Sequence, residues 1–271
     1  MMEHEYNNPV TQGQRVFTCG HSFHVWVADI LADMARDAGF ADHCIVGTSP
    51  IGGSRAIQHW DVPDEQNEAK KALRAGNVDV LTLSCMSGPD EGIRNFAKLA
   101  VEYNPSVRVT VQELWLPEDR FPFDPSNRMP KSPEEYAATT MAELLPPHQA
   151  YFQVMEDYVN ALNAEIGKCA VFVVPDAQAT LALREKIITG TVSGLDRQSE
   201  LFTDSWGHPA PPLMALAGYC HFAAIYRRSP QGLPIPTVLA DNPRWDDVLN
   251  HLLQTLAWEA VSQHPLAGVR Y

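Results

Sequence analysis

Two short segments of this chain carry residue types that can catalyse acyl transfer. The first is the turn Gly20-His21-Ser22, which follows a short apolar run (Val16, Phe17 and Cys19) and precedes an amphipathic stretch. A strand, a tight turn and a helix in this order hold a serine hydroxyl at the carboxyl edge of a sheet. The N–H groups of a helix N-terminus lie beside it. Ser22 is therefore a candidate nucleophile, and the alternative is that Ser22 only caps the helix.

The second segment lies near the C-terminus and holds Asp204 and His208 in a loop before an apolar helical stretch. A carboxylate at this spacing can fix the tautomer of the imidazole, and the imidazole can then accept a proton from a serine. The alternative is that Asp204 caps a turn while His208 packs against Trp206.

Together, the two segments resemble the SGNH (GDSL-like) hydrolase superfamily. Its nucleophile block is Gly-Asp-Ser or Gly-Asn-Ser, and its last block is Asp-x-x-His. The resemblance implies that Ser22 is the nucleophile, that His208 is the general base and that Asp204 orients His208. This chain departs from the family in its His21, and in the three residues between Asp204 and His208 where the family has two.

The resemblance also implies an oxyanion hole that combines the Ser22 N–H with a glycine after the second strand and an Asn after the third. Gly52 and Gly53 both suit the glycine position, because a glycine N–H can approach a substrate oxygen without a Cβ in the way. A simple loop turn is the alternative. The family's Gly-x-Asn-Asp block is absent, since the chain reads SCMSGPDEGIRNF there, and the third donor stays open.

Several polar and aromatic residues fall near the same expected sheet edge, and we treat them as candidate substrate contacts: His21, Arg55, His59, Gln112, Trp115 and Trp206. A Trp and an amide beside a cleft suit a sugar ring, which offers apolar C–H faces and hydroxyls. For Trp115, burial under the following segment is the alternative. We therefore expect a serine esterase that needs no cofactor and acts on a small-molecule ester or an acylated carbohydrate.

Two other classes of function stay open. The first is a metal-dependent hydrolase that uses His21, His24 and His59, although no HExxH spacing completes a zinc site. The second is a non-catalytic protein that binds a glycan or another ligand, in which the missing Asn block reflects lost catalysis. The Gly190–Gly194 loop lacks the Lys of a phosphate-binding P-loop.

Short apolar runs alternate with helical patterns along the chain. The expected strands are 15–19, 44–48, 78–84, 107–112 and 169–174, and the expected helices are 24–38, 64–75, 90–103, 133–166, 177–189, 211–226 and 244–262. Continuous apolar strands are typical of parallel sheets covered on both faces. The pattern predicts a three-layer α/β/α sandwich with a doubly wound, five-stranded parallel sheet of the flavodoxin-like type, in which ligands bind at the carboxyl ends of the strands.

The length of 271 residues favours one domain. We expect a Pro-rich insertion at about 116–147, which is either an ordered excursion or a lid, and a C-terminal helical extension at about 240–264.

The formal charge of -13 argues against a nucleic-acid partner. No apolar run is long enough to span a membrane. Five scattered cysteines without a CxxC pair predict reduced, buried thiols. The polar N-terminus favours the cytoplasm, unless a signal peptide has been removed. The oligomeric state stays open.

Overall fold

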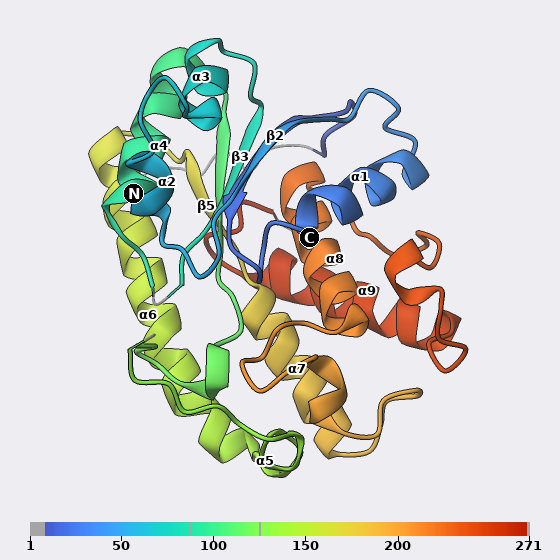
Figure 1. Ribbon diagram of the computed structural model, residues 1–271. Coiled ribbons are helices and arrows are strands. Elements are labelled where there is room, and N and C mark those ends of the chain that lie inside the picture. The colour runs from blue at the N-terminus through green and yellow to red at the C-terminus, as the bar shows by residue number, and fades with distance from the viewer. Residues whose placement is uncertain (1–8, 87, 125, 270–271) are drawn as a thin grey trace.

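Five parallel strands form the centre of the molecule. The computed structural model describes residues 9–86, 88–124 and 126–269. The strands are β1 (Arg15–Gly20), β2 (Cys44–Pro50), β3 (Val80–Ser84), β4 (Arg108–Gln112) and β5 (Val171–Val174). Their order across the sheet is β2-β1-β3-β4-β5, and every neighbouring pair is parallel (Figure 1). This is the flavodoxin-like order. The predicted fold class is confirmed.

Helices cover both faces of the sheet (Figure 1). One face carries α1 (Val27–Asp37), α7 (Asp176–Ile188), α8 (Pro211–Tyr226) and α9 (Asp247–Gln263). The other face carries α2 (Ala56–Trp60), α3 (Glu68–Arg74), α4 (Glu91–Tyr103) and α6 (Met141–Ile166). Each face of the sheet has its own apolar core. Neighbouring residues of one strand point to opposite cores, since Val16 packs on the α8 side and Phe17 on the α4 side.

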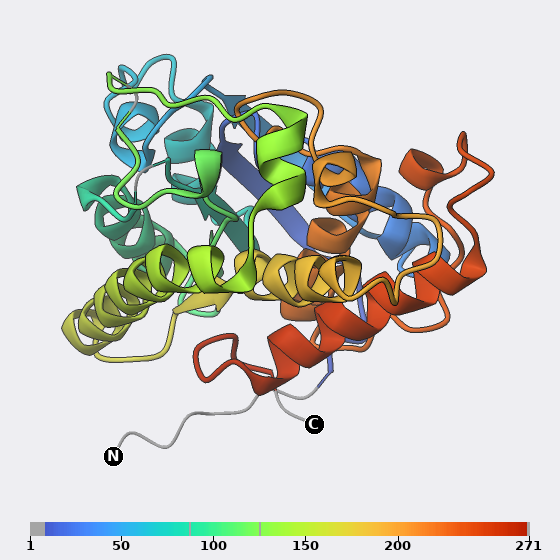
Figure 2. The ribbon, with the colours of Figure 1, turned by 90° about the horizontal axis from the view of Figure 1, so that it is seen from below.

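Helix α8 is apolar nearly all round because it is enclosed on all sides. It packs against α1 and α9, and in the view from below the red helix α9 lies across α7 and α8 (Figure 2). Almost every side chain of α8 is buried, as expected for a helix that has no solvent face.

Strand β2 differs from the expectation that every strand is covered on both faces. It lies at the edge of the sheet, and its residues are only partly buried or exposed. Cys44, at its start, is an exposed thiol, whereas Cys19, Cys85 and Cys220 are buried free thiols as expected.

The segment between β4 and α6 also differs from the expected single helix over 133–166. The chain forms α5 (Pro133–Ala138) and then α6, and Ser132 and Thr140 each begin a helix with a capping box. Helix α6 starts at Met141, so the insertion ends earlier than the expected residue 147. Short 3-10 turns lie at η1 (Pro117–Asp119), η2 (Gln198–Leu201) and η3 (Thr237–Leu239).

The five-residue helix α2 has too few turns to show a helical period in the sequence. Among the described residues, no helix is both long and apolar enough to cross a membrane.

Candidate active site

Ser22 lies in the turn that joins β1 to α1, between the strands where the direction of winding reverses. The His21 carbonyl accepts the N–H groups of His24 and Val25, which closes the turn and leaves Ser22 exposed. Gly20 is required here, since a Cβ would lie 2.5 Å from the His24 ring. The capping alternative is wrong for Ser22, because α1 begins only at Val27, with Trp26 at its N-cap.

The structure brings Ser22, His208 and Asp204 into one line of hydrogen bonds. Ser22 Oγ lies 2.8 Å from His208 Nε2, and His208 Nδ1 lies 2.6 Å from Asp204 Oδ2. Asp204 Oδ1 accepts the backbone N–H groups of Trp206 at 2.9 Å and His208 at 3.2 Å. Asp204 therefore closes the turn of its own loop and also contacts the imidazole, so the extra residue in this block does not separate the pair.

The hydrogen bonds to Asp204 favour its ionised form. Partial burial acts to raise the pKa of this carboxyl group, but the side-chain and backbone hydrogen bonds from His208, together with the Trp206 N–H, hold the pKa below its ordinary value. A carboxylate that stays ionised keeps the proton of the imidazole on Nδ1, which leaves Nε2 able to accept a proton from Ser22.

The loop that carries Asp204 and His208 is fixed from two sides. The indole Nε1–H of buried Trp115 donates to the Gly207 carbonyl at 2.9 Å, and the Thr203 N–H donates to the His208 carbonyl at 2.8 Å. The ring of Phe23 lies 4.7 Å from the ring of His208. Packing and backbone contacts thus hold the imidazole above the Ser22 turn.

A cavity of about 230 Å³ opens beside the serine and the imidazole. Four of the residues expected in the site line it, namely Ser22, Gly53, Trp206 and His208. Sequence analysis missed the rest of the lining: Phe23, Met86, Pro117, Phe123 and Arg128. The position of Phe23, directly after the serine, is the one signal that pointed to any of them.

Arg128 reaches this lining from the segment between β4 and α6, and no sequence motif indicates its position. Its Nε donates to Glu118 Oε1 at 2.8 Å, and its guanidinium group stacks on the Trp206 ring, 2.9 Å from the centroid. Glu118 is fully buried, so its ion pair fixes the position of the Arg128 guanidinium group. The stacking on Trp206 then brings the insertion into contact with the loop of Asp204 and His208.

Two of the residues expected in the oxyanion hole line this cavity. Ser22 and Gly53 both line it, and their N–H groups donate to no acceptor among the described residues. Gly53 has φ +61°, and a Cβ there would meet nothing within 4 Å, so backbone conformation rather than crowding favours glycine. Of the two glycines expected in the oxyanion hole, Gly53 lines the cavity and Gly52 does not. Ser87, in the region of the missing Asn block, lies outside the described residues.

Three of the six expected substrate contacts are internal supports of the Ser22 turn or of the neighbouring loop. His21 is buried, accepts the Phe23 N–H at Nδ1 and bonds Ser84 Oγ through Nε2. Gln112 is buried and donates to the Phe23 carbonyl at 3.3 Å and to Asp176 at 2.8 Å. Trp115 is buried as well, as the alternative interpretation of this residue predicted.

Two more of the expected substrate contacts, Arg55 and His59, follow Gly52 and Gly53 in the chain and do not line the cavity. His59 is buried between two serine hydroxyls, with Ser49 Oγ at 2.8 Å and Ser54 Oγ at 2.7 Å. Arg55 is exposed and pairs with Asp90 at 3.3 Å, outside the cavity. Of the six candidates, Trp206 alone lines the cavity, because the other side chains are turned away by the packing of the turn and its neighbours.

The expected metal ligands are not grouped in the structure. Both ring nitrogens of His21 are engaged as described, and His24 Nε2 bonds Thr82 Oγ1 at 3.1 Å inside the core. Among the described residues, Glu113, Glu156 and His264 do come together. His264 Nδ1 accepts the Leu266 N–H at 3.1 Å, however, so the proton of a neutral imidazole stays on Nε2 and blocks it as a ligand.

Comparison with known proteins addresses the fold. No protein-family model matches the chain, and no curated protein matches its sequence. The chain is similar in structure to a DUF4886 family protein from Bacteroides uniformis, with 14% identity and a TM-score of 0.55 over 93% of this chain and 95% of that one. The shared property is the fold.

Two further solved structures match more loosely. A protein from Slackia heliotrinireducens that is proposed to be an SGNH hydrolase has 16% identity and a TM-score of 0.46, over 78% of this chain and 97% of that one. A proposed GDSL-like lipase from Parabacteroides merdae has 11% identity and a TM-score of 0.47, over 81% and 99%. At these identities, function has to be argued from the site itself.

Proposed function

We propose that this protein is a serine esterase of the SGNH type, with Ser22, His208 and Asp204 as its catalytic residues. The observation that carries the proposal is the continuous line of contacts, 2.8 Å from Ser22 Oγ to His208 Nε2 and 2.6 Å from His208 Nδ1 to Asp204 Oδ2. This line ends at a cavity that is also lined by Gly53, and the N–H groups of Ser22 and Gly53 donate to no acceptor among the described residues. Such an arrangement serves nucleophilic catalysis on an acyl group.

In the proposed reaction, Ser22 Oγ attacks the carbonyl carbon of the ester as His208 Nε2 takes the hydroxyl proton. The carbonyl oxygen becomes an oxyanion, which the N–H groups of Ser22 and Gly53 stabilise. His208 then returns the proton to the leaving alcohol, and the acyl group remains on Ser22. Water, activated by the same imidazole, releases the acid and restores the serine. No cofactor enters this sequence.

The lining of the cavity supports a substrate with a small acyl group. Phe23, Met86, Pro117 and Phe123 make most of the wall apolar, and the volume of about 230 Å³ limits the length of chain that fits. Trp206 is 43% exposed at the same cavity and offers an aromatic face to the alcohol part. We propose an acylated carbohydrate or another small polar ester as the substrate.

Labelling with a fluorophosphonate probe tests the nucleophile. The wild-type protein should be labelled and should hydrolyse p-nitrophenyl acetate, and Ser22→Ala should lose both properties. Ser49→Ala is a matched control, because Ser49 Oγ also contacts a histidine, His59, yet lies outside the cavity. Labelling that persists in Ser22→Ala and disappears in Ser49→Ala would overturn the assignment.

A panel of esters tests the substrate class. Hydrolysis should favour p-nitrophenyl acetate over the octanoate, and acetylated sugars should release acetate. Saturable sugar binding without turnover or labelling would instead identify a non-catalytic binding protein.

A further inference from the structure

Arg128 carries the one permanently charged side chain among the described residues that line the cavity beside Ser22. The proposed reaction gives this side chain no role, because the proton moves between Ser22 and His208 and the oxyanion is met by backbone N–H groups. The Arg128 side chain is only 18% exposed. A charged group in a mostly apolar, partly enclosed cavity is unfavourable unless its donors are used.

The ion pair with Glu118 uses only part of this guanidinium group. Arg128 Nε donates to Glu118 Oε1 at 2.8 Å, whereas Glu118 Oε2 accepts the backbone N–H of Met129, also at 2.8 Å. The second oxygen of the carboxylate is thus used by the backbone, and Arg128 Nη2 is buried without a partner among the described residues. A buried donor without an acceptor is unfavourable, so a ligand that supplies the acceptor gains binding energy.

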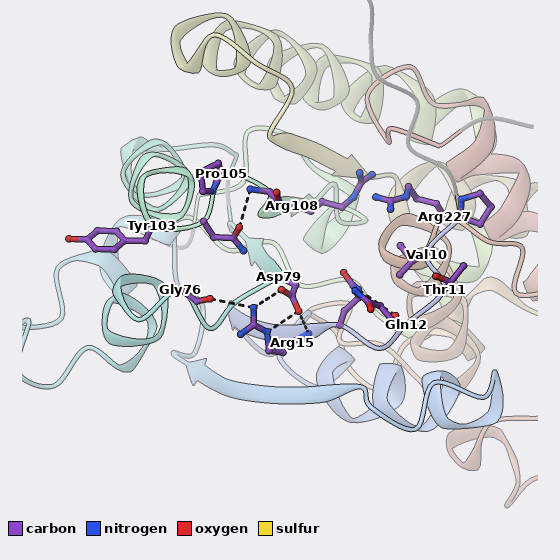
Figure 3. Close-up of a pocket in the computed structure, with 14 residues that line it drawn as sticks. Val10, Thr11, Gln12, Arg15, Gly76, Asp79, Tyr103, Pro105, Arg108 and Arg227 are labelled. Atoms are coloured by element: carbon purple, nitrogen blue, oxygen red, sulfur yellow. Dashed lines mark hydrogen bonds and ion pairs between the residues drawn. The ribbon is translucent and has the colours of Figure 1, made fainter.

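An arginine in a second hollow shows how one carboxylate can occupy these donors. This hollow lies at the amino ends of the strands, on the opposite edge of the sheet from Ser22 (Figure 3). Arg15 there binds both oxygens of Asp79, with Nη2 2.7 Å from Oδ1 and Nε 3.0 Å from Oδ2. Its Nη2 also donates to the Gly76 carbonyl at 3.3 Å. Arg128 has no such two-oxygen contact with its own carboxylate partner.

Two aromatic rings fix the plane of the Arg128 guanidinium group. Its carbon lies 2.9 Å from the centre of the Trp206 ring and 5.1 Å from the centre of the Phe123 ring. Because the N–H donors of arginine lie in the guanidinium plane, stacking covers a face and leaves the edge for hydrogen bonds. Trp206 is exposed, so this pair of side chains lies where the cavity meets solvent and where the alcohol part of an ester has to leave.

We propose that Arg128 binds a carboxylate on the alcohol part of the substrate, which makes the preferred substrate an ester that itself carries a carboxylate. This specificity rests on the proposed esterase activity. The two oxygens of a carboxylate match two neighbouring N–H groups of a guanidinium. None of the described residues that line the cavity is acidic. Arg120 Nη2 lies 3.8 Å from Glu118 Oε2, so two arginines share one carboxylate and the three side chains together keep a positive charge.

Two acetate esters of the same shape test this specificity. The first, 4-acetoxybenzoate, carries a carboxylate, and 4-acetoxybenzamide carries a neutral amide in its place. The wild-type protein should show a kcat/KM at least about tenfold higher for the carboxylate, chiefly through a lower KM. Arg128→Gln should lose this preference. Arg128→Lys keeps a cation beside the buried Glu118 and so protects the fold, but should lose most of the preference because an ammonium group lacks the planar fork.

Arg120→Gln is the matched control, because Arg120 also approaches Glu118 but does not line the cavity. It should keep the wild-type ratio of the two kcat/KM values. A general disturbance of the His208 loop lowers both rates and leaves this ratio unchanged. Turnover of both esters without preference, or a wild-type ratio in both Arg128 variants, would overturn the specificity and leave the esterase proposal standing. If the protein hydrolyses neither ester nor p-nitrophenyl acetate and takes no fluorophosphonate label, both proposals fall.

Discussion

The proton of the His208 ring decides whether Ser22 can react. Asp204 Oδ2 holds that proton on Nδ1 at 2.6 Å, and the free Nε2 lone pair then faces the serine hydroxyl. An amide in place of the carboxylate could donate its NH2 group to Nδ1, which favours the tautomer that carries its proton on Nε2. At the scale of single residues, we therefore expect the proposed activity to depend on the charge of Asp204 as much as on the nucleophile.

Asp204→Asn should therefore lower kcat for p-nitrophenyl acetate by roughly 10³-fold or more, with little change in KM, since a wrong tautomer disables the base without altering the cavity. Steady-state kinetics measures the effect. Asp196→Asn, at an exposed carboxylate that pairs with Arg244, is the control and should keep its activity. Equal kcat values for wild type and Asp204→Asn would refute the triad.

Glu113 shows a different single-residue effect, on stability. This carboxyl group is buried directly after β4, and its Oε1 has no hydrogen-bond partner among the described residues. Burial, with the nearby Glu156 charge, raises its pKa to about 8. In the unfolded chain it ionises near its ordinary value, so between those two pKa values the folded protein holds a proton that the unfolded chain has lost. The free energy of unfolding must therefore fall as pH rises from about 4.5 to 8.

Glu113→Gln mimics the protonated side chain and should remove this dependence. Urea denaturation at pH 5 and pH 9 measures it. The variant should match the wild type at pH 5 and exceed its free energy of unfolding at pH 9 by on the order of 5 kcal/mol. Glu102→Gln, on the exposed surface of α4, should leave the pH dependence unchanged. A variant that is less stable than the wild type at pH 9 would contradict the burial argument.

The segment between β4 and α6 connects the sheet to the loop that carries Asp204 and His208. Glu118 and Asp119 both have left-handed backbones, with φ +56° and +54°. Glu118 binds Arg128, while Asp119 binds Lys131 at 2.8 Å and Arg184 of α7 at 2.5 Å. Strained residues persist where their surroundings fix them, which is often beside a functional site. At the scale of elements, these ion pairs hold the insertion against the cavity.

Trp115→Phe tests how this segment positions the loop that carries Asp204 and His208. The variant keeps an aromatic ring but leaves the buried Gly207 carbonyl without its donor at 2.9 Å, which should cost about 1 kcal/mol of stability. We expect kcat to fall about tenfold with a smaller change in KM, because the loop that holds His208 loses a support. Trp258→Phe, on the far helix α9, serves as the comparison. An unchanged kcat in Trp115→Phe would show that the loop needs no such support.

At the scale of the whole molecule, two apolar cores on opposite faces share one sheet. Leu253 of α9 is fully buried against the core that also contains Val16 of β1, and Phe17 of the same strand belongs to the other core. We therefore predict that the C-terminal helix and the sheet unfold together as one domain.

Leu253→Ala should lower the free energy of unfolding by about 3 kcal/mol, because it leaves a cavity under α9. Circular dichroism and tryptophan fluorescence should report the same midpoint of the unfolding transition for each protein, and both midpoints should shift equally in the variant. Val248→Ala, at a position that is 64% exposed on the same helix, should change the midpoint little. Two separated transitions would show that α9 folds independently of the sheet.

The sequence by itself determined the features that depend on local chemistry. Apolar runs and helical periods predicted the five strands and the doubly wound sheet, and the strand–turn–helix path placed Ser22 at its carboxyl edge. Asp204 and His208 are close along the chain, so their contact follows from the geometry of one loop.

Tertiary structure decided what depends on packing between distant segments. It brought His208 to Ser22 across 186 residues and buried His21, Gln112 and Trp115 as supports. It also placed Arg128 in the cavity beside Ser22. The direction of a side chain is set by which neighbours enclose it, and those neighbours are not adjacent in the sequence.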